Sequence, residues 1–111
     1  MTRSGLGEFE QIVLLAIARL GDEAYGTTVR REIARRAGRD VSVGALYATL
    51  ERLETKGLVR TREGEPTAQR GGRAKRYYEL SAAGVRGLRA ARAALDRMWD
   101  GLDLRARGSR T

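Results

Sequence analysis

The spacing of apolar residues along this chain switches from a helical period to a strand period and back, and this order constrains the fold more than any other feature. Residues 9–20 form an apolar run that stops at Gly21. The length of the run, its alanines and the glycine that ends it favour a helix over a strand. Because apolar residues lie on more than one side of this helix, it is expected to be covered by its own domain and in part by a second chain.

Two further helices are expected to follow in close succession. The first spans residues 27–37 and ends at Gly38. Its expected inner face consists of Val29, Ile33, Ala34 and Ala37, and its outer face carries Arg30, Arg31, Arg35 and Arg36. The next helix is expected to begin after Ser42, because serine is a favourable N-cap, and to close at Lys56 and Gly57. Its expected apolar face consists of Val43, Leu46, Leu50 and Leu53.

The period then shortens to that of β-strands. Residues 58–63 and 75–80 are expected to form two short strands, joined by a loop that contains the only proline of the chain and several glycines. The pattern predicts a hairpin with a long basic tip. Tyr77 and Tyr78 are neighbours in the second strand, so one faces the core and the other faces outward, and periodicity does not decide which.

A last helix is expected over residues 82–104, capped by Ser81. Its apolar stripe has spacings of 3, 4, 3 and 4 and consists of Leu88, Ala91, Leu95, Met98 and Leu102. This is the spacing of a coiled-coil seam, and the stripe is long for so small a domain, so pairing with the same helix of a second chain is expected. The alternative is packing on the first helix of the same chain, and both contacts can coexist. Trp99 widens the stripe and is expected in the dimer core.

Three helices, a hairpin and a further helix, in that order, are the plan of a winged helix-turn-helix. The expected fold class is therefore α+β, mainly helical with a small β-hairpin, with an additional C-terminal dimerisation helix. We expect residues 1–81 to form the winged helix-turn-helix domain and residues 82–104 to form the dimerisation helix. Residues 105–111 are expected to be a basic, disordered tail.

Composition excludes several classes of site. The chain has no cysteine and no histidine, which removes disulfides, thiolate metal sites and the commonest metal ligand and general base. No pair of acidic residues lies in an apolar setting that would support catalysis, so we expect no enzyme activity, no catalytic residues, no metal and no cofactor. No stretch approaches the ~18–20 apolar residues of a membrane span, and no signal-peptide core is present. A cytoplasmic protein without membrane contact is expected.

The charge of the chain points to a polyanionic partner. It has 22 basic and 14 acidic residues and a formal net charge of +8, which makes nucleic acid the default candidate. In the third helix the outward side near the N-terminus holds Gly44, Ala45 and Ala48, with Tyr47 on its flank and Arg52 one turn on. Small side chains let a helix approach the floor of a major groove, and Ser42 with the first-turn amides can hold a phosphate. The alternative is an ordinary helix surface.

The hairpin tip concentrates cations around two glycines: Arg70, Gly71, Gly72, Arg73, Lys75 and Arg76. A run of charges on its own is more often a solvated surface than a binding site. Directly after a helix-turn-helix pattern, however, a basic loop is expected to act as a wing that contacts the DNA backbone or a minor groove.

Three stretches taken together closely resemble the PadR family of transcriptional regulators. They are Ala24-Tyr25-Gly26, the segment 41–59 that begins Val41-Ser42-Val43-Gly44-Ala45-Leu46-Tyr47, and the segment 71–84 that contains Gly71-Gly72-Arg73 and Tyr77-Tyr78. The resemblance covers about residues 6–100, and the short last helix is similar to that of the compact subfamily. It implies a dimeric repressor that binds a palindromic operator of double-stranded DNA.

The resemblance also implies roles for individual residues. In the family the third helix enters the major groove, which implies contacts by Ser42, Gly44, Ala45, Tyr47 and, more loosely, Arg52. The wing role would fall to Arg73, Lys75 and Arg76. Family members dimerise through their first and last helices, in agreement with the stripe described above. Some compact members hold flat aromatic compounds against a tryptophan of the last helix, so Trp99 is a candidate contact for a small aromatic effector.

Two other functions remain open. The winged helix could be a protein-interaction module whose charge serves an acidic partner, or a nucleic-acid binder without sequence preference. The small-residue face and the dimer stripe favour a sequence-specific regulator, because a two-fold symmetric protein matches a two-fold symmetric operator.

Overall fold

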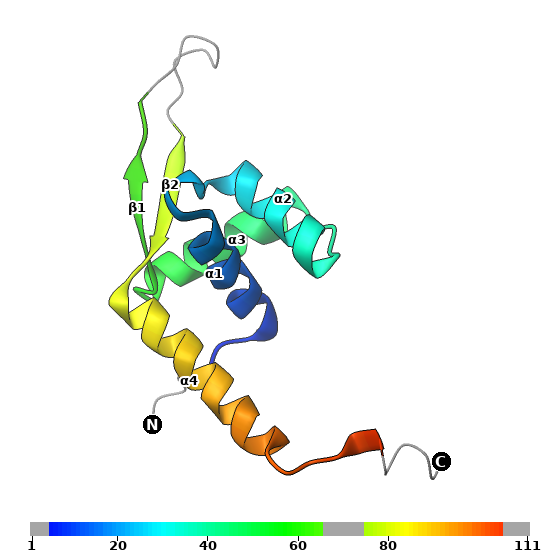
Figure 1. Cartoon of the computed structure of the whole chain (residues 1–111). Helices are drawn as coiled ribbons and strands as arrows, with labels where there is room; N and C mark the ends of the chain where they lie inside the picture. The colour runs from blue at the N-terminus through cyan, green and yellow to red at the C-terminus, as the bar shows by residue number, and fades with distance from the viewer. Residues whose placement is uncertain (1–4, 66–74, 106–111) are drawn as a thin grey trace.

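The computed structural model describes residues 5–65 and 75–105, and within them the order of elements is the expected one. Three helices come first, then an antiparallel hairpin, then a helix that leaves the body of the molecule (Figure 1). The elements are α1 (Glu8–Leu20), the 3₁₀ turn η1 (Gly21–Glu23), α2 (Gly26–Ala37), α3 (Val43–Thr55), β1 (Val59–Glu63), β2 (Arg76–Leu80) and α4 (Ala82–Trp99). The winged-helix α+β fold predicted from the sequence is therefore confirmed.

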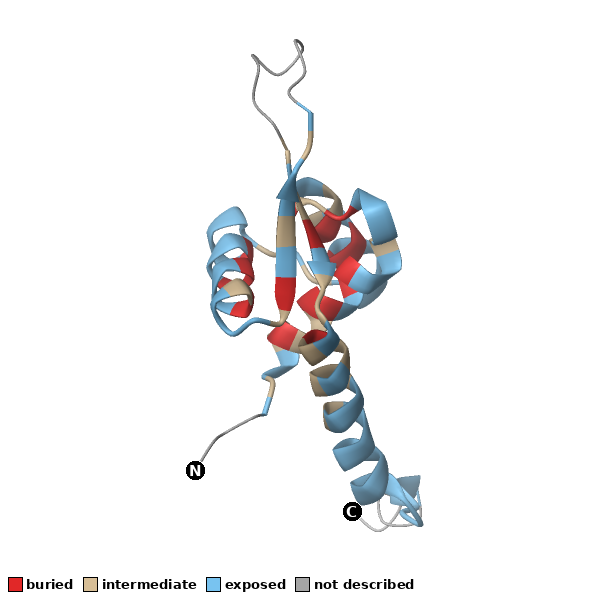
Figure 2. Ribbon diagram, turned by 90° about the vertical axis from the view of Figure 1, so that its left-hand side faces the viewer, coloured by how far each residue is buried: buried red, intermediate tan, exposed pale blue. Residues whose placement is uncertain are grey.

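The core lies where α1, α2 and α3 meet, and the hairpin covers one side of it (Figure 2). Its fully buried side chains are Val13, Leu14, Ile17, Val29, Ile33, Leu46, Leu50 and Leu53. At about 25 cal/mol per Å² of apolar surface, side chains of this size each contribute roughly 1.5–3 kcal/mol when fully buried. The packing of α1, α2 and α3 around one core fixes the orientation of α3. The side of α3 that faces away from this core is exposed.

The predicted inner faces of α2 and α3 need correction at their ends. Ala34 and Ala37, in the second half of α2, are exposed, and so is Val43 at the first position of α3. A helix face that is buried along its middle emerges from the core at its ends, which periodicity does not reveal. Glu32 of α2 is buried instead, and Arg35 and Arg36 neutralise it at 2.8 and 3.3 Å.

The hairpin pairs β1 with β2 in a register that places Val59 opposite Leu80 and Thr61 opposite Tyr78. Each strand is one residue shorter than predicted. Tyr78 is the tyrosine that faces the core, with 6% of its surface exposed, and burial raises the pKa of its phenol. Tyr77 lies on the other side of the strand and packs edge-on against Tyr25, with ring centroids 5.4 Å apart.

Helix α4 begins as predicted but ends earlier. The hydroxyl of Ser81 accepts a hydrogen bond from the amide of Gly84 at 3.1 Å, which confirms Ser81 as the cap. The helix ends at Trp99 rather than at residue 104, because the chain turns at Gly101, whose φ of 75° is one that glycine adopts readily. Leu102 therefore lies beyond the helix, and the prediction that it continues the apolar stripe is wrong.

Candidate nucleic-acid interface

The start of α3 is an exposed surface of small residues. Ser42 caps the helix, and its hydroxyl accepts a hydrogen bond from the Ala45 amide at 3.1 Å. Ser42, Gly44, Ala45 and Ala48 are all exposed, whereas Leu46 and Leu50 on the other side are buried. Small side chains on this side leave the helix backbone accessible. The structure thus places the predicted contact residues of α3 together on one free face.

Tyr47 is both packed and exposed. Its side chain crosses Gly26, the first residue of α2, so closely that a Cβ on that glycine would lie 1.8 Å from the phenol oxygen. Even so, Tyr47 is 46% exposed. Because Gly26 lacks a side chain, the ring can lie flat between the two helices while its outer surface stays available to a partner.

The turn between α2 and α3 is held by Arg30 of the basic second helix. Arg30 donates a hydrogen bond from Nε to the carbonyl of Val41 at 2.7 Å and lies 4.0 Å from the carboxylate of Asp40. Arg31 and Thr27, one helical turn apart, line a polar hollow of about 250 Å³ beside this turn. The cations of α2 therefore lie next to the start of α3.

The described part of the wing carries two of its three predicted contact residues. Lys75 lies over the ring of Tyr25, with Nζ 4.3 Å from the ring centroid and 3.3 Å from the phenol oxygen. Arg76 donates to the carboxylate of Glu54 at 3.1 Å. Arg73 lies outside the described residues. Tyr25 and Arg62 were not among the predicted site residues, and Arg62 stacks on Tyr77 at 4.4 Å.

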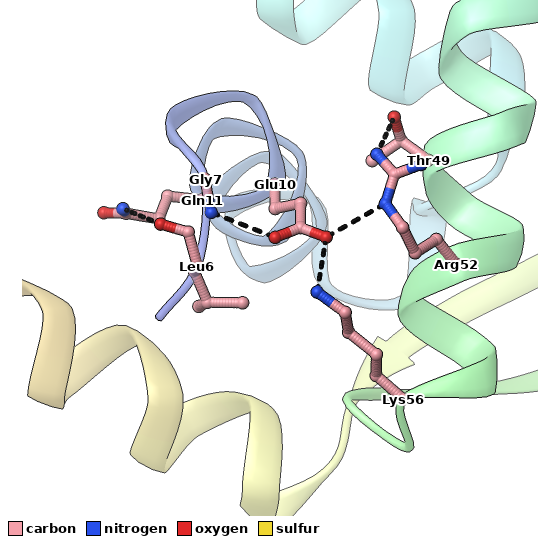
Figure 3. A network of polar contacts seen from close by, with 7 residues as sticks. All are labelled: Leu6, Gly7, Glu10, Gln11, Thr49, Arg52 and Lys56. Carbon is pink, nitrogen blue, oxygen red and sulfur yellow. Dashed lines mark hydrogen bonds and ion pairs between the residues drawn. The ribbon is translucent and has the colours of Figure 1, made fainter. Parts of the chain in front are cut away.

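Arg52 is held in place by two hydrogen bonds on the protein surface. Its Nε donates to Glu10 of α1 at 3.1 Å, and Nη2 donates to the hydroxyl of Thr49 at 3.2 Å (Figure 3). The side chain remains 51% exposed. Its contact with a phosphate stays a prediction, and the hydrogen bonds to Glu10 and Thr49 hold the guanidinium in one position. Glu10 was not among the site residues predicted from the sequence. The one signal for it is a carboxylate set within an otherwise apolar helical run.

Glu10 is a buried carboxylate that remains ionised. Burial alone would raise its pKa. Hydrogen bonds from Lys56, from the amide of Gly7 and from Arg52, with the charge of Lys56, lower the pKa instead from 4.5 to about 2. The bond from Lys56 Nζ is 2.8 Å long and that from Gly7 is 3.0 Å long. A carboxylate of α1 is thus bonded to two cations at the end of α3.

An apolar groove of about 610 Å³ lies between α1 and α4. Its walls include Leu15, Ala18, Val85, Leu88, Leu95 and Trp99. Of the predicted dimer residues, Leu88 packs partly on the core and Ala91 is half-buried. Leu95, Met98 and Trp99 are 55%, 75% and 57% exposed. The apolar stripe of α4 thus has only its first half covered within a single chain.

The described residues contain no group of three or more acidic side chains that could hold a metal ion. None of the helices in the described part of the chain is both long and apolar enough to cross a bilayer. The exposed start of α3, the start of α2 and the base of the hairpin together form the candidate site.

Comparison with known proteins finds a matching family model and solved structures of similar fold. The sequence model of the transcriptional regulator PadR-like family matches residues 13–90. A PadR family transcriptional regulator from Eggerthella lenta is 26% identical, with a TM-score of 0.66 over 85% of this chain and 81% of that one. A PadR-like transcription factor from Bacteroides fragilis is 25% identical, with a TM-score of 0.66 over 81% and 82% of the two chains.

A third solved structure shares the fold. It is a transcriptional regulator from Clostridium thermocellum, 21% identical, with a TM-score of 0.68 over 81% of this chain and 84% of that one. No curated protein matches the sequence significantly.

Proposed function

Because the chain belongs to the PadR-like family of DNA-binding transcriptional regulators, we propose that it is a repressor that binds a palindromic operator as a homodimer. The family consists of regulators and not of enzymes, which agrees with the expectation from the sequence. The observation that carries the proposal is the free face of α3, where a capped helix start and small side chains lie opposite a fully buried leucine face.

In this proposal α3 enters the major groove. Small residues let the helix backbone approach the base edges, and alanine can contact a thymine methyl. The proposed contacts of α3 are Ser42, Gly44, Ala45, Tyr47 and, to a phosphate, Arg52. The hairpin acts as a wing through Arg73, Lys75 and Arg76. The cation–π contact of Lys75 with Tyr25 supports this role, because it holds the amine at the base of the hairpin.

The homodimer is supported by the uncovered half of α4. Three large apolar side chains, Leu95, Met98 and Trp99, are more than half exposed along one helix, together with Leu15 of α1. A monomer in water rarely leaves such a stripe free, and a second copy of the same helix would cover it. A dimer with two-fold symmetry presents two recognition helices, which explains the proposed palindromic operator.

A small aromatic effector that releases the DNA is the further element of this proposal. The groove between α1 and α4 has the size and the apolar walls of a small-molecule site. Trp99 lies in its wall and offers a flat surface for stacking. An effector seated between the proposed dimer helices would act on the distance between the two copies of α3.

The test is a fluorescence-anisotropy titration with DNA from upstream of the chain's own gene, scrambled DNA as the comparison, and several salt concentrations. We expect roughly 10³-fold or more tighter binding to the upstream DNA, and a steep loss of affinity with salt. Equal affinity for both DNAs would contradict a sequence-specific regulator. No binding at low salt would favour a module for an acidic protein partner.

Variants of the wing, measured in the same titration, test whether its cations contact DNA phosphates. Arg73→Ala combined with Lys75→Ala should weaken binding to every DNA and flatten the salt slope by about 2, because two phosphate contacts are removed. The matched control removes two cations from α4, with Arg86→Ala and Arg97→Ala, both exposed. If the wing variant and the control lose affinity equally, the loss reflects net charge and the wing assignment is wrong.

A further inference from the structure

The hydrogen bonds of Glu10 join α1 to α3. The proposed function assigns dimerisation to α1 and DNA recognition to α3. Glu10 belongs to α1, one of the two proposed dimer helices, and its side chain is only 7% exposed. Its oxygen Oε2 accepts hydrogen bonds from Arg52 at 3.1 Å and from Lys56 at 2.8 Å, both at the C-terminal end of α3 (Figure 3). Its other oxygen accepts the Gly7 amide at 3.0 Å. The carboxylate is therefore hydrogen-bonded both to the start of its own helix and to α3.

Stability alone does not account for a buried carboxylate at this position. Moving a charge out of water is costly, and the attraction of its partners does little more than offset that cost. Apolar contacts would hold α1 and α3 together at least as well, as Leu14 and Leu50 do in the core nearby. Apolar contacts, however, are non-directional, so two helices joined only by them can slide and rotate. The two hydrogen bonds that Arg52 and Lys56 donate to Glu10 have a defined length and direction and restrict that movement.

A second ion pair joins the same turn of α1 to the segment between α2 and α3. Glu8 lies 2.6 Å from Arg39, which precedes the cap residue Ser42 by three positions. This pair is exposed, with 78% of the Glu8 side chain in solvent, and exposed pairs contribute little. The two acidic residues thus make similar links in different surroundings, which provides a matched comparison.

We propose that Glu10 is a positioning residue that fixes the orientation of α3 relative to α1 and thereby sets the distance between operator half-sites that the dimer accepts. The proposal rests on the proposed function, since it needs two copies of α3 related through α1 and α4. Half-sites one helical turn apart are separated by roughly 34–36 Å, so a small rotation of α3 on α1 moves the two reading surfaces out of register with the DNA.

The first experiment measures the orientation within one chain, without DNA. The chain has no cysteine, so spin labels can be placed by Arg19→Cys on α1 and Ala48→Cys on α3, both exposed positions. Labelled protein diluted with unlabelled protein reports only distances within a chain, by double electron–electron resonance. We expect a single narrow distribution in the parent protein. Glu10→Gln, which keeps the shape but loses the charge, should broaden or shift it, while Glu8→Gln should leave it unchanged.

The second experiment measures the consequence for DNA. Duplexes carry the two half-sites of the upstream DNA at centre-to-centre distances varied in steps of one base pair around one helical turn. We expect the parent protein to prefer one distance by about tenfold, and Glu10→Gln to reduce that preference to about threefold or less. Lys56→Gln, which leaves Arg52 on the carboxylate, should have a smaller effect in the same direction. A protein that is merely less stable would lose affinity equally at all distances.

The outcomes separate this inference from the function on which it rests. Unchanged label distances in Glu10→Gln would overturn the positioning role. Changed label distances with an unchanged preference among duplexes would also overturn it, because Glu10 would then be structural only. If the parent protein binds no duplex specifically, the proposed function fails, and the label distances still decide whether Glu10 orients α3.

Discussion

At the scale of single residues, the carboxylate of Glu10 stays ionised although it is buried. Hydrogen bonds and the charge of Lys56 lower its pKa from 4.5 to about 2 against the opposing effect of burial. A lowered pKa in the folded state means that the unfolded chain binds the proton more tightly. Stability from Glu10 is therefore complete above about pH 4.5 and is lost as the pH falls toward about 2.

This shift leads to a prediction about acid stability. The free energy of unfolding of the unaltered protein should exceed that of Glu10→Gln at pH 7, and the difference should shrink by about 3 kcal/mol as the pH falls from about 4.5 to about 2. Urea denaturation at a series of pH values measures it. Glu8→Gln is the control, and its difference should stay within about 0.5 kcal/mol throughout. A difference for Glu10→Gln that does not depend on pH would show that the carboxylate is not held in this way.

At the scale of elements, two glycines in the first half of α4 differ in what surrounds them. Gly84 is buried against the turn before β1, and a Cβ there would lie 2.2 Å from the carbonyl oxygen of Leu58. The same carbonyl accepts the amide of Ser81 at 3.0 Å. Gly87, one turn later, would bring its Cβ to 3.4 Å from the end of the flexible Leu6 side chain. The hairpin and α4 are thus joined where only glycine fits.

Replacing each of the two glycines with alanine should change the free energy of unfolding in opposite directions. Gly84→Ala should destabilise the fold by roughly 1–3 kcal/mol, because the backbone of the turn between α3 and β1 must move. Gly87→Ala should stabilise it by roughly 0.5–1 kcal/mol, because alanine reduces the conformational freedom of the unfolded chain. Both are measured by urea denaturation under one set of conditions. Equal effects of the two substitutions would mean that α4 is not anchored at Gly84.

At the scale of the whole molecule, the outer half of α4 projects away from the core (Figure 1), and among the described residues its large apolar side chains are more than half exposed. Its N-terminal turns contact the hairpin and α1, while its exposed apolar side chains lie beyond the reach of the core. The fold of a single chain therefore does not depend on those side chains, and the proposed dimer does.

Changing the exposed stripe should separate folding from association. Leu95→Gln combined with Trp99→Gln should weaken the dimer by about 100-fold or more, because large apolar groups at the centre of an interface dominate its affinity. The helical circular dichroism of the monomer should be retained. Sedimentation velocity measures the association state. Ala93→Gln, roughly 160° around the helix from Leu95, is the control. A double variant that remains a dimer at low concentration would contradict the proposed interface.

Much of this protein could be predicted from local signals in the sequence. The order of elements, the Ser42 and Ser81 caps and the buried leucines of α3 follow from apolar period and from residue types at helix ends, which act over about four residues. The exposed small-residue face of α3 follows from the same periodicity. These features depend on neighbours in sequence, so the order of residues was enough to determine them.

Other features were decided only by the tertiary structure. Which tyrosine of β2 faces the core depends on the docking of the hairpin, and Val43 and Ala34 are exposed because the core ends before they do. The DNA contact of Arg52 stays a prediction, but the bond between its guanidinium and Glu10, 42 positions away in the chain, had no signal in the local pattern. Such contacts form only when separate elements pack together. The reason is physical: a local pattern shows which face a residue occupies, and packing decides what that face meets.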